Sequence, residues 1–247
     1  MTARTSFDFT GTTVLITGGT SGIGHATALL FRDAGAEVTV TGTRADAGEY
    51  DSDLADIRYR RLVLTDEESI TALVAEIGVL DVLINNAGAN FPDGLDERTP
   101  EGFERSVAIN LTGTYRLTRR LHGSLAASTA AGGASVVNLA SMAALRAVPV
   151  VPGYGAAKAG IISLTRNLAV AWAGDGIRVN AVAPGTTRTP MTAPMRPETA
   201  AAELAHIPIG RFGDADEIAP TLAFLCTEQS AYTTGAVFVV DGASDCI

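Results

Sequence analysis

Residues 12–24 of the chain, TTVLITGGTSGIG, contain the pattern that decides the fold. Thr12 to Thr17 are apolar or β-branched and predict a short buried β-strand. A glycine-rich turn follows with the spacing Gly18-x3-Gly22-x-Gly24, and a helical pattern with one apolar face starts at Ile23. Glycine permits a sharp turn and a close approach of the backbone to a pyrophosphate, and a helix N-terminus adds N–H groups and a positive dipole end. The stretch therefore predicts a phosphate cradle, although a tight strand-to-helix turn would have the same pattern.

The rest of the chain alternates strands and helices in the same way. Strand patterns occur at residues 37–41, 59–64, 82–85, 135–139, 178–183 and 237–240, and helical patterns at 67–77, 100 to about 127, 154–172 and 215–225. Such alternation predicts the α/β class, with a doubly wound parallel sheet and helices on both faces. We find no linker, low-complexity segment or charge run, so we expect one domain over residues 1–247.

The composition argues against several classes of protein. The chain has 247 residues, of which 47% are hydrophobic, so it can bury a sizeable core. A net charge of -9 without a Lys/Arg run argues against nucleic acid and anionic membranes as partners. No apolar run is long enough to span a membrane, and Met1 to Thr10 lack the apolar segment of a secretory signal. Cys226 and Cys246 give no disulfide framework and the three histidines are scattered, so we expect a cytoplasmic protein without a metal site.

Four conspicuous segments follow the ends of predicted strands. They are the Gly18 loop, Asn85-Asn86-Ala87-Gly88, Ser141 and Pro184-Gly185. Ligands of such sheets bind beyond the carboxyl ends of the strands. We therefore expect these segments to meet at one rim of the sheet and to form one site.

Tyr154 and Lys158 are a candidate acid/base pair. Residues four apart on a helix lie on the same face, so the phenol and the ammonium should point into the same space. A free phenol has a pKa of about 10, and a cation within a few ångströms lowers that pKa. A packed ring and a solvated charge are the alternative explanation for this spacing.

The ordered set of motifs resembles the short-chain dehydrogenase/reductase family. The set is Thr17-Gly18-x3-Gly22-Ile23-Gly24, Asn85-Asn86-Ala87-Gly88, Asn110, Ser141, Tyr154-x3-Lys158 and Pro184-Gly185. Each motif is weak alone, but the series is specific, and the likeness extends from Thr12 to Gly242. The resemblance implies a Rossmann-type fold, a nicotinamide cofactor, hydride transfer between an alcohol and a ketone, and a homotetramer.

The resemblance also implies four catalytic residues. Tyr154 would be the general acid in carbonyl reduction and the general base in alcohol oxidation. Lys158 would lower the pKa of Tyr154 and hold the nicotinamide ribose. Ser141 would hydrogen-bond the substrate oxygen. Asn110 would bend the long predicted helix and anchor a water molecule that leads to the lysine.

For the cofactor, the resemblance implies contacts along the whole rim. The implied residues are Gly18, Thr20, Ser21, Gly22, Ile23, Gly24, Thr43, Arg44, Leu64, Asn86, Ala87, Gly88, Tyr154, Lys158, Pro184, Gly185, Thr187 and Thr189. Val63 stands where the family often has an acid that meets the adenine, so the Leu64 backbone is expected to replace that contact. The connection from Arg44 to Tyr59 is short and acidic, and we expect its usual helix to be stunted.

The end of the second strand bears on the choice of cofactor. An acidic residue there accepts from the ribose 2′-hydroxyl and repels a 2′-phosphate, which favours NAD. This chain has Gly42 at that position, and Thr43 and Arg44 follow with groups suited to a phosphate. We therefore favour NADP(H). Asp46 could instead turn back to the ribose, which would leave NAD(H) as the alternative.

The substrate pocket is expected between residues 141–153 and a mobile lid at 191–209, where several prolines break regular structure. Its candidate residues are Met142, Leu145, Val148, Val150, Val151, Met191 and Met195, which are all apolar. An anionic group of the substrate could meet Arg146, Arg188 or Arg196, and an acidic acyl carrier could dock on Arg116, Arg119 and Arg120. For all six, a solvated surface is the simpler role and the one we favour.

Two hypotheses for the function follow. The first is an oxidoreductase for a small or medium apolar ketone or alcohol, a 3-oxoacyl group being one candidate. The second is a non-catalytic sensor or scaffold that binds the same cofactor on the same fold. The complete set of Asn110, Ser141, Tyr154 and Lys158 favours the enzyme.

Overall fold

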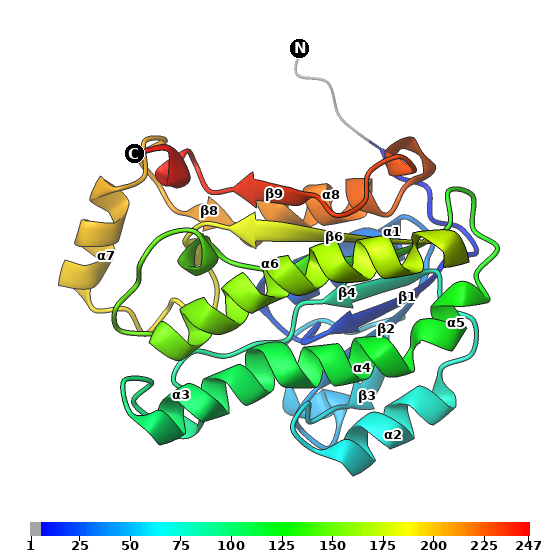
Figure 1. The fold of residues 1–247 in the computed structure, drawn as a ribbon, viewed down its shortest axis with the longest axis horizontal. Coiled ribbons are helices and arrows are strands. Elements are labelled where there is room, and N and C mark those ends of the chain that lie inside the picture. Colours follow the sequence, from blue (N-terminus) through cyan, green and yellow to red (C-terminus); the bar gives the residue numbers. More distant parts are fainter. Residues whose placement is uncertain (1–5) are drawn as a thin grey trace.

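The computed structural model describes residues 6–247. Its centre is a parallel sheet of seven strands in the order β3-β2-β1-β4-β5-β6-β9 (Figure 1). The strands are β1 (Thr13–Thr17), β2 (Glu37–Gly42), β3 (Arg58–Arg61), β4 (Val82–Asn85), β5 (Ala134–Leu139), β6 (Ile177–Pro184) and β9 (Val237–Val240). The order reverses beside β1, which confirms the doubly wound α/β fold expected from the sequence.

The strands form because their side chains are apolar on both faces. Every residue of β4, β5 and β6 is buried, and four of the five residues of β1 are buried as well. This is the pattern of a sheet that is covered on both sides.

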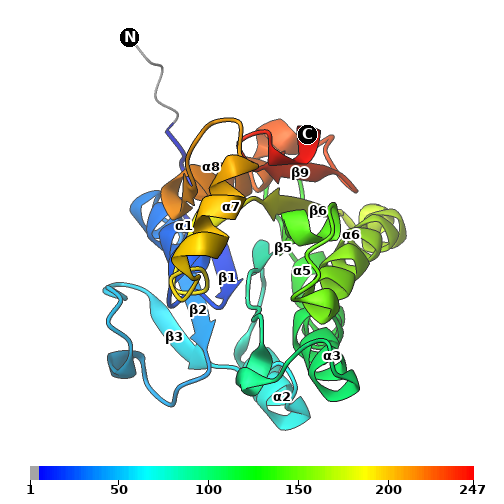
Figure 2. The same ribbon diagram turned by 90° about the vertical axis from the view of Figure 1, so that its left-hand side faces the viewer.

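Helices cover both faces of the sheet. On one face lie α1 (Gly22–Asp33) and α8 (Ala215–Leu225), which pack Phe31 and Leu222 against the strands. On the other lie α2 (Glu67–Glu76), α3 (Pro100–Val107), α4 (Thr114–Arg120), α5 (His122–Ala126) and α6 (Pro152–Trp172). Figure 2 shows the two layers on opposite sides of the strands.

The long helix expected from Pro100 to about Ala127 is interrupted. A π-helical turn at Ala108–Gly113 separates α3 from α4, and Leu121 separates α4 from α5. The N-terminus agrees with the prediction, because the Thr99 side chain accepts from the Gly102 N–H at 3.2 Å. Asn110 lies inside the π turn, where the helix departs from its regular hydrogen bonding.

Two other boundaries differ from the expected ones, and a third expectation is met. β3 ends at Arg61 rather than Leu64, since Leu62 turns away from the ladder after one further backbone bond, to Gly42. α6 begins at Pro152, two residues before Tyr154, because proline suits the first helical position. The connection after β2 holds only a 3₁₀ turn at Ala47–Glu49, which confirms that its helix is stunted.

The segment predicted to be a lid lies beyond the carboxyl ends of the strands (Figure 1). It contains α7 (Pro197–Ala205), none of whose residues is buried. A small second sheet pairs β7 (Thr187–Arg188) with β8 (Gly213–Asp214) and frames this segment at both ends.

Candidate active site

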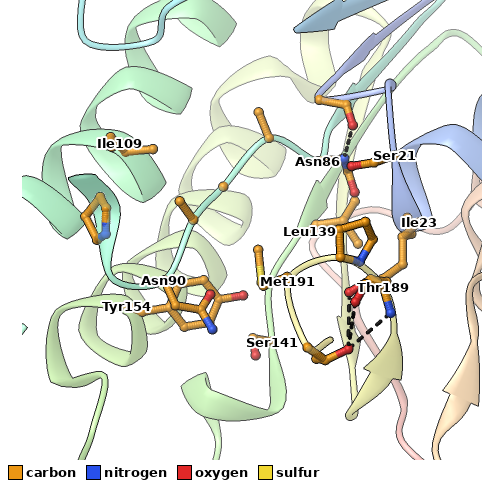
Figure 3. A pocket seen from close by; sticks show the side chains of 18 of the residues that line it. Ser21, Ile23, Asn86, Asn90, Ile109, Leu139, Ser141, Tyr154, Thr189 and Met191 are labelled. Carbon is orange, nitrogen blue, oxygen red and sulfur yellow. Dashed lines mark hydrogen bonds between the residues drawn. The ribbon is translucent and has the colours of Figure 1, made fainter. Parts of the chain in front are cut away.

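One cavity of about 740 Å³ lies at the carboxyl ends of the strands. Its walls include the Gly18 loop after β1, Asn86 to Asn90 after β4, Leu139 to Ala143 after β5, and Pro184 to Thr187 after β6. The four segments predicted to share one rim therefore do so. Figure 3 shows Ser21, Ile23 and Asn86 toward one end of the cavity, and Asn90, Ser141 and Tyr154 toward the other.

The Asn86 side chain anchors the glycine loop by hydrogen bonds to its backbone. Its Nδ2 donates to the carbonyls of Thr17 at 3.1 Å and Gly18 at 2.9 Å. A Cβ on Gly18 would lie 2.9 Å from the Ala87 Cα, and Gly18 also has a φ of +65°. Gly24 does not line the cavity; a Cβ there would overlap the Asn86 amide. The glycines thus allow close packing of β4 against the turn, as well as access for a ligand.

The residues at this end fit the diphosphate of a dinucleotide. Ser21, the N-cap of α1, makes no side-chain capping bond, and Ser21, Gly22 and Ile23 all line the cavity. The amides of a first helical turn have no partner within the helix, so they are available to an anion together with the positive end of the helix dipole. Thr20, Leu64, Ala87, Gly88, Pro184, Gly185, Thr187 and Thr189 also line the cavity.

Tyr50 occupies the space next to Gly42 and was missed by sequence reasoning. A Cβ on Gly42 would overlap the Tyr50 hydroxyl, so glycine is required there by packing. The Tyr50 Oη accepts from the Arg44 N–H at 2.9 Å, and the Arg44 guanidinium lies 4.7 Å from the centre of the Tyr50 ring. Thr43 and Tyr50 line the cavity, whereas Arg44 and Asp46 do not.

Tyr154 and Lys158 both line the other end of the cavity, where Lys158 is buried and Tyr154 is half-buried. Lys158 Nζ donates to the Leu139 carbonyl at 2.6 Å and lies 5.5 Å from the centre of the Tyr154 ring. Burial lowers the pKa of Lys158 to about 8. An amine and a phenol in this arrangement can exchange protons with a ligand oxygen.

The expectation that Lys158 lowers the pKa of Tyr154 is not met in this structure. Burial raises the pKa of the Tyr154 phenol, a hydrogen bond from Ser141 lowers it, and the charge of Glu97 raises it further. The physical reason is that Lys158 gives its hydrogen bond to Leu139, so loss of water around the phenol has the larger effect.

Asn110 lies behind the cavity wall and fixes the backbone of Ala89. Its Oδ1 accepts from the Ala89 N–H at 3.0 Å, and its Nδ2 donates to the Ala89 carbonyl at 2.8 Å and the Ser106 carbonyl at 3.0 Å. The π turn brings the Asn110 side chain close to Gly88, where a Cβ would meet Oδ1. The π turn lies at the residue where the family resemblance implies a bend; the bend and the water molecule stay predictions.

The apolar part of the cavity agrees with most of the predicted substrate pocket. Met142, Val148, Val151, Met191 and Met195 line it. Leu145 and Val150 were predicted to do so but do not, because they lie in the turn before α6 with exposed fractions of 40% and 53%.

Three of the six candidate arginines form ion pairs with acidic side chains. Arg146 pairs with Glu203 of α7 at 2.5 Å and Arg188 with Asp214 at 2.9 Å, while Arg120 pairs with Glu67. Arg105 lines the cavity and pairs with Asp93 at 2.7 Å.

Sequence reasoning also missed Asn90 and Glu97. Asn90 lines the cavity, and its Oδ1 is buried without a hydrogen-bond partner among the described residues. Glu97 is fully buried and accepts from the Tyr154 N–H at 2.6 Å. Both residues lie in an irregular loop with other polar residues, so no periodic pattern marks them.

Within residues 6–247, no helix is long and apolar enough to cross a membrane, and no group of three or more His, Cys, Asp or Glu side chains could hold a metal ion. Cys226 and Cys246 are both free thiols.

Comparison with known proteins places the chain in a family. Residues 18–243 match the family model described as enoyl-(acyl carrier protein) reductase. The chain is 38% identical to cis-4-hydroxycyclohexanecarboxylate dehydrogenase of Sinomonas cyclohexanicum, with 92% of this chain and 94% of the relative covered. It is 34% identical to 3-oxoacyl-(acyl-carrier-protein) reductase of Thermotoga maritima, with 94% and 97% covered.

Solved structures agree with these matches. A short chain dehydrogenase/reductase family protein superimposes with a TM-score of 0.85 at 33% identity, covering 98% of this chain and 100% of the other. The RhlG/NADP active-site complex of Pseudomonas aeruginosa gives 0.86 at 30% identity, also covering 98% and 100%. With the rim motifs and the fold, these matches identify the chain as a member of the short-chain dehydrogenase/reductase family, an NAD(P)-dependent oxidoreductase that acts on alcohol and carbonyl groups.

Proposed function

We propose that this protein interconverts a small or medium, mainly apolar secondary alcohol and its ketone. The observation that carries the proposal is the cavity itself, in which Ser141, Tyr154 and Lys158 share one space with the apolar side chains of Met142 and Met191. A polar reactive end against an apolar wall suits a substrate with one reacting oxygen on a hydrocarbon frame.

Each polar residue then has a definite task. The Ser141 hydroxyl donates to the substrate oxygen and stabilises the negative charge that develops on it during reduction. The Tyr154 phenol gives its proton to that oxygen in reduction and takes it back in oxidation. Lys158 holds the ribose of the nicotinamide and replenishes the proton, while Asn110 keeps the wall at Ala89 in place. The nicotinamide, when bound, supplies or accepts the hydride.

We propose NADP(H) as the cofactor, with NAD(H) as the alternative. At the adenosine end, the cavity-lining residues include Thr20, Thr43 and Tyr50 but no carboxylate; its two acidic residues, Asp93 and Glu203, belong to the segments beside the substrate pocket. A 2′-phosphate would therefore meet hydroxyl groups, with the Arg44 guanidinium within reach over the Tyr50 ring. The relative from Pseudomonas aeruginosa, described as an NADP complex, supports the same choice.

Asn90 suggests that the substrate carries a second polar group. A buried amide oxygen without a hydrogen bond costs roughly 1–3 kcal/mol, and native proteins rarely retain one. Because the Asn90 residue lines the cavity, a rotation of its side chain would let Oδ1 accept from a hydroxyl on a carbon near the reacting one. The related cis-4-hydroxycyclohexanecarboxylate dehydrogenase is named for such a substrate, a ring alcohol with a second polar substituent. A 3-oxoacyl thioester, suggested by the Thermotoga maritima relative, is the second candidate.

We propose further that the protein is a cytoplasmic homotetramer. The outer surfaces of α3, α4 and α6 carry Phe103, Tyr115 and Val170 with exposed fractions of 39%, 44% and 84%. Exposed apolar side chains on neighbouring helices are suited to burial between copies of the chain. Soluble proteins usually bury such surfaces in closed symmetric oligomers.

The test is turnover with a substrate panel in the presence of NADPH or NADH. The panel contains cyclohexanol, the 1,2-, 1,3- and 1,4-cyclohexanediols, 4-hydroxycyclohexanecarboxylate and a 3-oxoacyl thioester. We expect at least one substituted ring alcohol to exceed cyclohexanol in kcat/KM, and Asn90→Leu to remove that advantage without changing cyclohexanol turnover. Cofactor binding without turnover of any member would favour the sensor hypothesis.

A further inference from the structure

Glu97 is a fully buried carboxylate whose two oxygens are both used. Oε1 accepts from the Phe91 N–H at 2.9 Å, and Oε2 accepts from the Tyr154 N–H at 2.6 Å. Tyr154 is the third residue of α6, so its N–H belongs to the first turn and has no partner within the helix. The N-cap residue Val151 makes no side-chain bond, and Glu97 supplies the capping acceptor from a distant part of the chain.

Within residues 6–247, no positive side chain forms an ion pair with Glu97. The neighbouring acids Asp96 and Asp93 pair with Arg98 and Arg105, in each case with both side chains substantially exposed. Burying an unpaired carboxylate costs several kcal/mol, and the dipole of a helix N-terminus offsets only part of that cost.

The second amide bound by Glu97 belongs to the cavity wall. Phe91 follows the cavity-lining residue Asn90 and starts a strained turn, with a left-handed φ of +46° at Phe91 and +57° at Asp93. Ala89, one residue before Asn90, is held on the opposite side by Asn110. Glu97 and Asn110 therefore hold the wall around Asn90 from both ends.

We propose that Glu97 is a positioning residue, whose carboxylate fixes the backbone of Tyr154 relative to the cavity wall at Phe91. This inference rests on the proposed role of Tyr154 as the acid/base. A neutral glutamine could not replace it, since its single carbonyl oxygen accepts from one of the two N–H groups and its NH₂ would face the other donor.

The charge of Glu97 has a second consequence for the reaction. The negative charge of Glu97, bound to the Tyr154 backbone N–H, disfavours the phenolate and raises the pKa of Tyr154. The other charged groups around the cavity are Lys158, on the same helix as Tyr154, and the ion pairs Asp93–Arg105 and Glu203–Arg146. Both pairs are internally neutral, and among the described residues Glu97 is the charged side chain that shifts the pKa of the phenol.

The experiment compares Glu97→Gln, Glu97→Asp and the exposed neighbour Asp96→Asn in the full-length protein. For each variant we would measure the melting temperature, the dissociation constant of NADPH by fluorescence, kcat and KM, and the pH dependence of kcat. A separate titration follows phenolate absorbance, and the difference from Tyr154→Phe isolates the Tyr154 signal. This titration needs no substrate, so it tests Glu97 even if the proposed reaction fails.

We expect Glu97→Gln to lower kcat about 10- to 100-fold, as displacements near 1 Å of a reacting group do, while KM and NADPH affinity stay near wild type. Its Tyr154 titration and its pH–rate limb should move to lower pH. Glu97→Asp keeps the charge but shortens the side chain, so kcat should fall while the pH dependence stays; it also covers the case in which Glu97→Gln does not fold. Asp96→Asn should resemble wild type. Unchanged phenol titration and kcat in the Glu97 variants, with only a lower melting temperature, would show that Glu97 is a structural cap and would overturn the inference.

Discussion

Lys158 and Tyr154 lie on one face of α6, but the Lys158 ammonium donates its hydrogen bond to the Leu139 carbonyl rather than to the phenol. This bond anchors the lysine to the end of β5, the strand that leads to Ser141. The bond thereby connects α6 to the end of β5, next to the cavity-lining residues Ser141, Tyr154 and Lys158. Two predictions concern this pair.

Tyr154→Phe should abolish turnover while cofactor binding stays nearly intact. Removal of a positioned proton donor typically costs about 10²–10⁴-fold in rate. The variant loses only one hydroxyl and keeps the ring that packs in the cavity. Steady-state kinetics together with fluorescence titration of the cofactor would check both statements. A near wild-type rate would show that another group carries the proton.

Lys158 should make the protein more stable at alkaline pH. Burial lowers its pKa to about 8 from the ordinary value of 10.5, so the folded state binds this proton less tightly than the unfolded state does. Stability is therefore reduced below about pH 8 and recovers as the pH rises from about 8 towards 10.5. Between pH 7 and pH 10, urea denaturation should show a gain on the order of 2–3 kcal/mol relative to the change seen in Lys158→Met. Parallel curves for the two proteins would contradict the lowered pKa.

The residues at the rim of the sheet could be predicted from the sequence because the ends of buried strands can be recognised in it. Gly18, Asn86, Ser141 and Gly185 each follow an apolar strand, and parallel topology brings the carboxyl ends of strands together whatever the loops do. The helical spacing of Tyr154 and Lys158 placed them on one face for an equally local reason.

Tyr50, Asn90 and Glu97 were not predictable in the same way. Each lies in an irregular segment, and its position depends on a tertiary contact. Tyr50 packs against Gly42, and Glu97 binds the Tyr154 N–H. Asn90 follows Ala89, whose backbone is bound by Asn110. Leu145 was misplaced for the same reason, since an apolar residue in a turn has no periodic neighbour to show which side it faces.

The segment from Met191 to Ile209 should become protected when substrate binds. α7 has no buried residue, and its contact with the cavity wall includes the Arg146–Glu203 pair and a bond from the Thr186 hydroxyl to Glu203 at 3.2 Å. Few apolar contacts favour local opening, and closure over a substrate would exclude water. Amide hydrogen exchange here should be fast in the free protein and slower with cofactor plus substrate. Equal exchange in the two states would argue against a gate.

Light scattering at micromolar concentration should give about four times the chain mass of 25.4 kDa. If α3, α4 and α6 form an interface, Val170→Glu should lower that mass, because a buried charge without a partner is costly. Val79→Glu is a matched control, an exposed apolar residue outside these helices. A monomeric wild type would exclude the tetramer, and an unaffected Val170→Glu variant would move the interface elsewhere.

The cofactor preference should depend on Arg44. Its guanidinium lies over the ring of the cavity-lining Tyr50, and we expect it to turn toward a 2′-phosphate. A hydrogen bond to a charged group contributes about 1.5–3 kcal/mol. Arg44→Ala should therefore weaken NADPH binding roughly 10- to 100-fold and leave NADH binding nearly unchanged. Arg58→Ala, an exposed arginine on β3, is the control.

Introducing the missing acid at Gly42 should require a second change. A Cβ on Gly42 would overlap the Tyr50 hydroxyl, so Gly42→Asp alone should disturb the loop and weaken both cofactors. In Gly42→Asp combined with Tyr50→Ala, the carboxylate has room to accept from a 2′-hydroxyl and repels a 2′-phosphate. The ratio of specificity constants for NADPH and NADH should then fall in the double variant relative to Tyr50→Ala alone. If the native protein instead prefers NADH, the ribose is recognised by Tyr50, Thr43 or backbone groups, and the glycine at position 42 serves only to make room for the tyrosine.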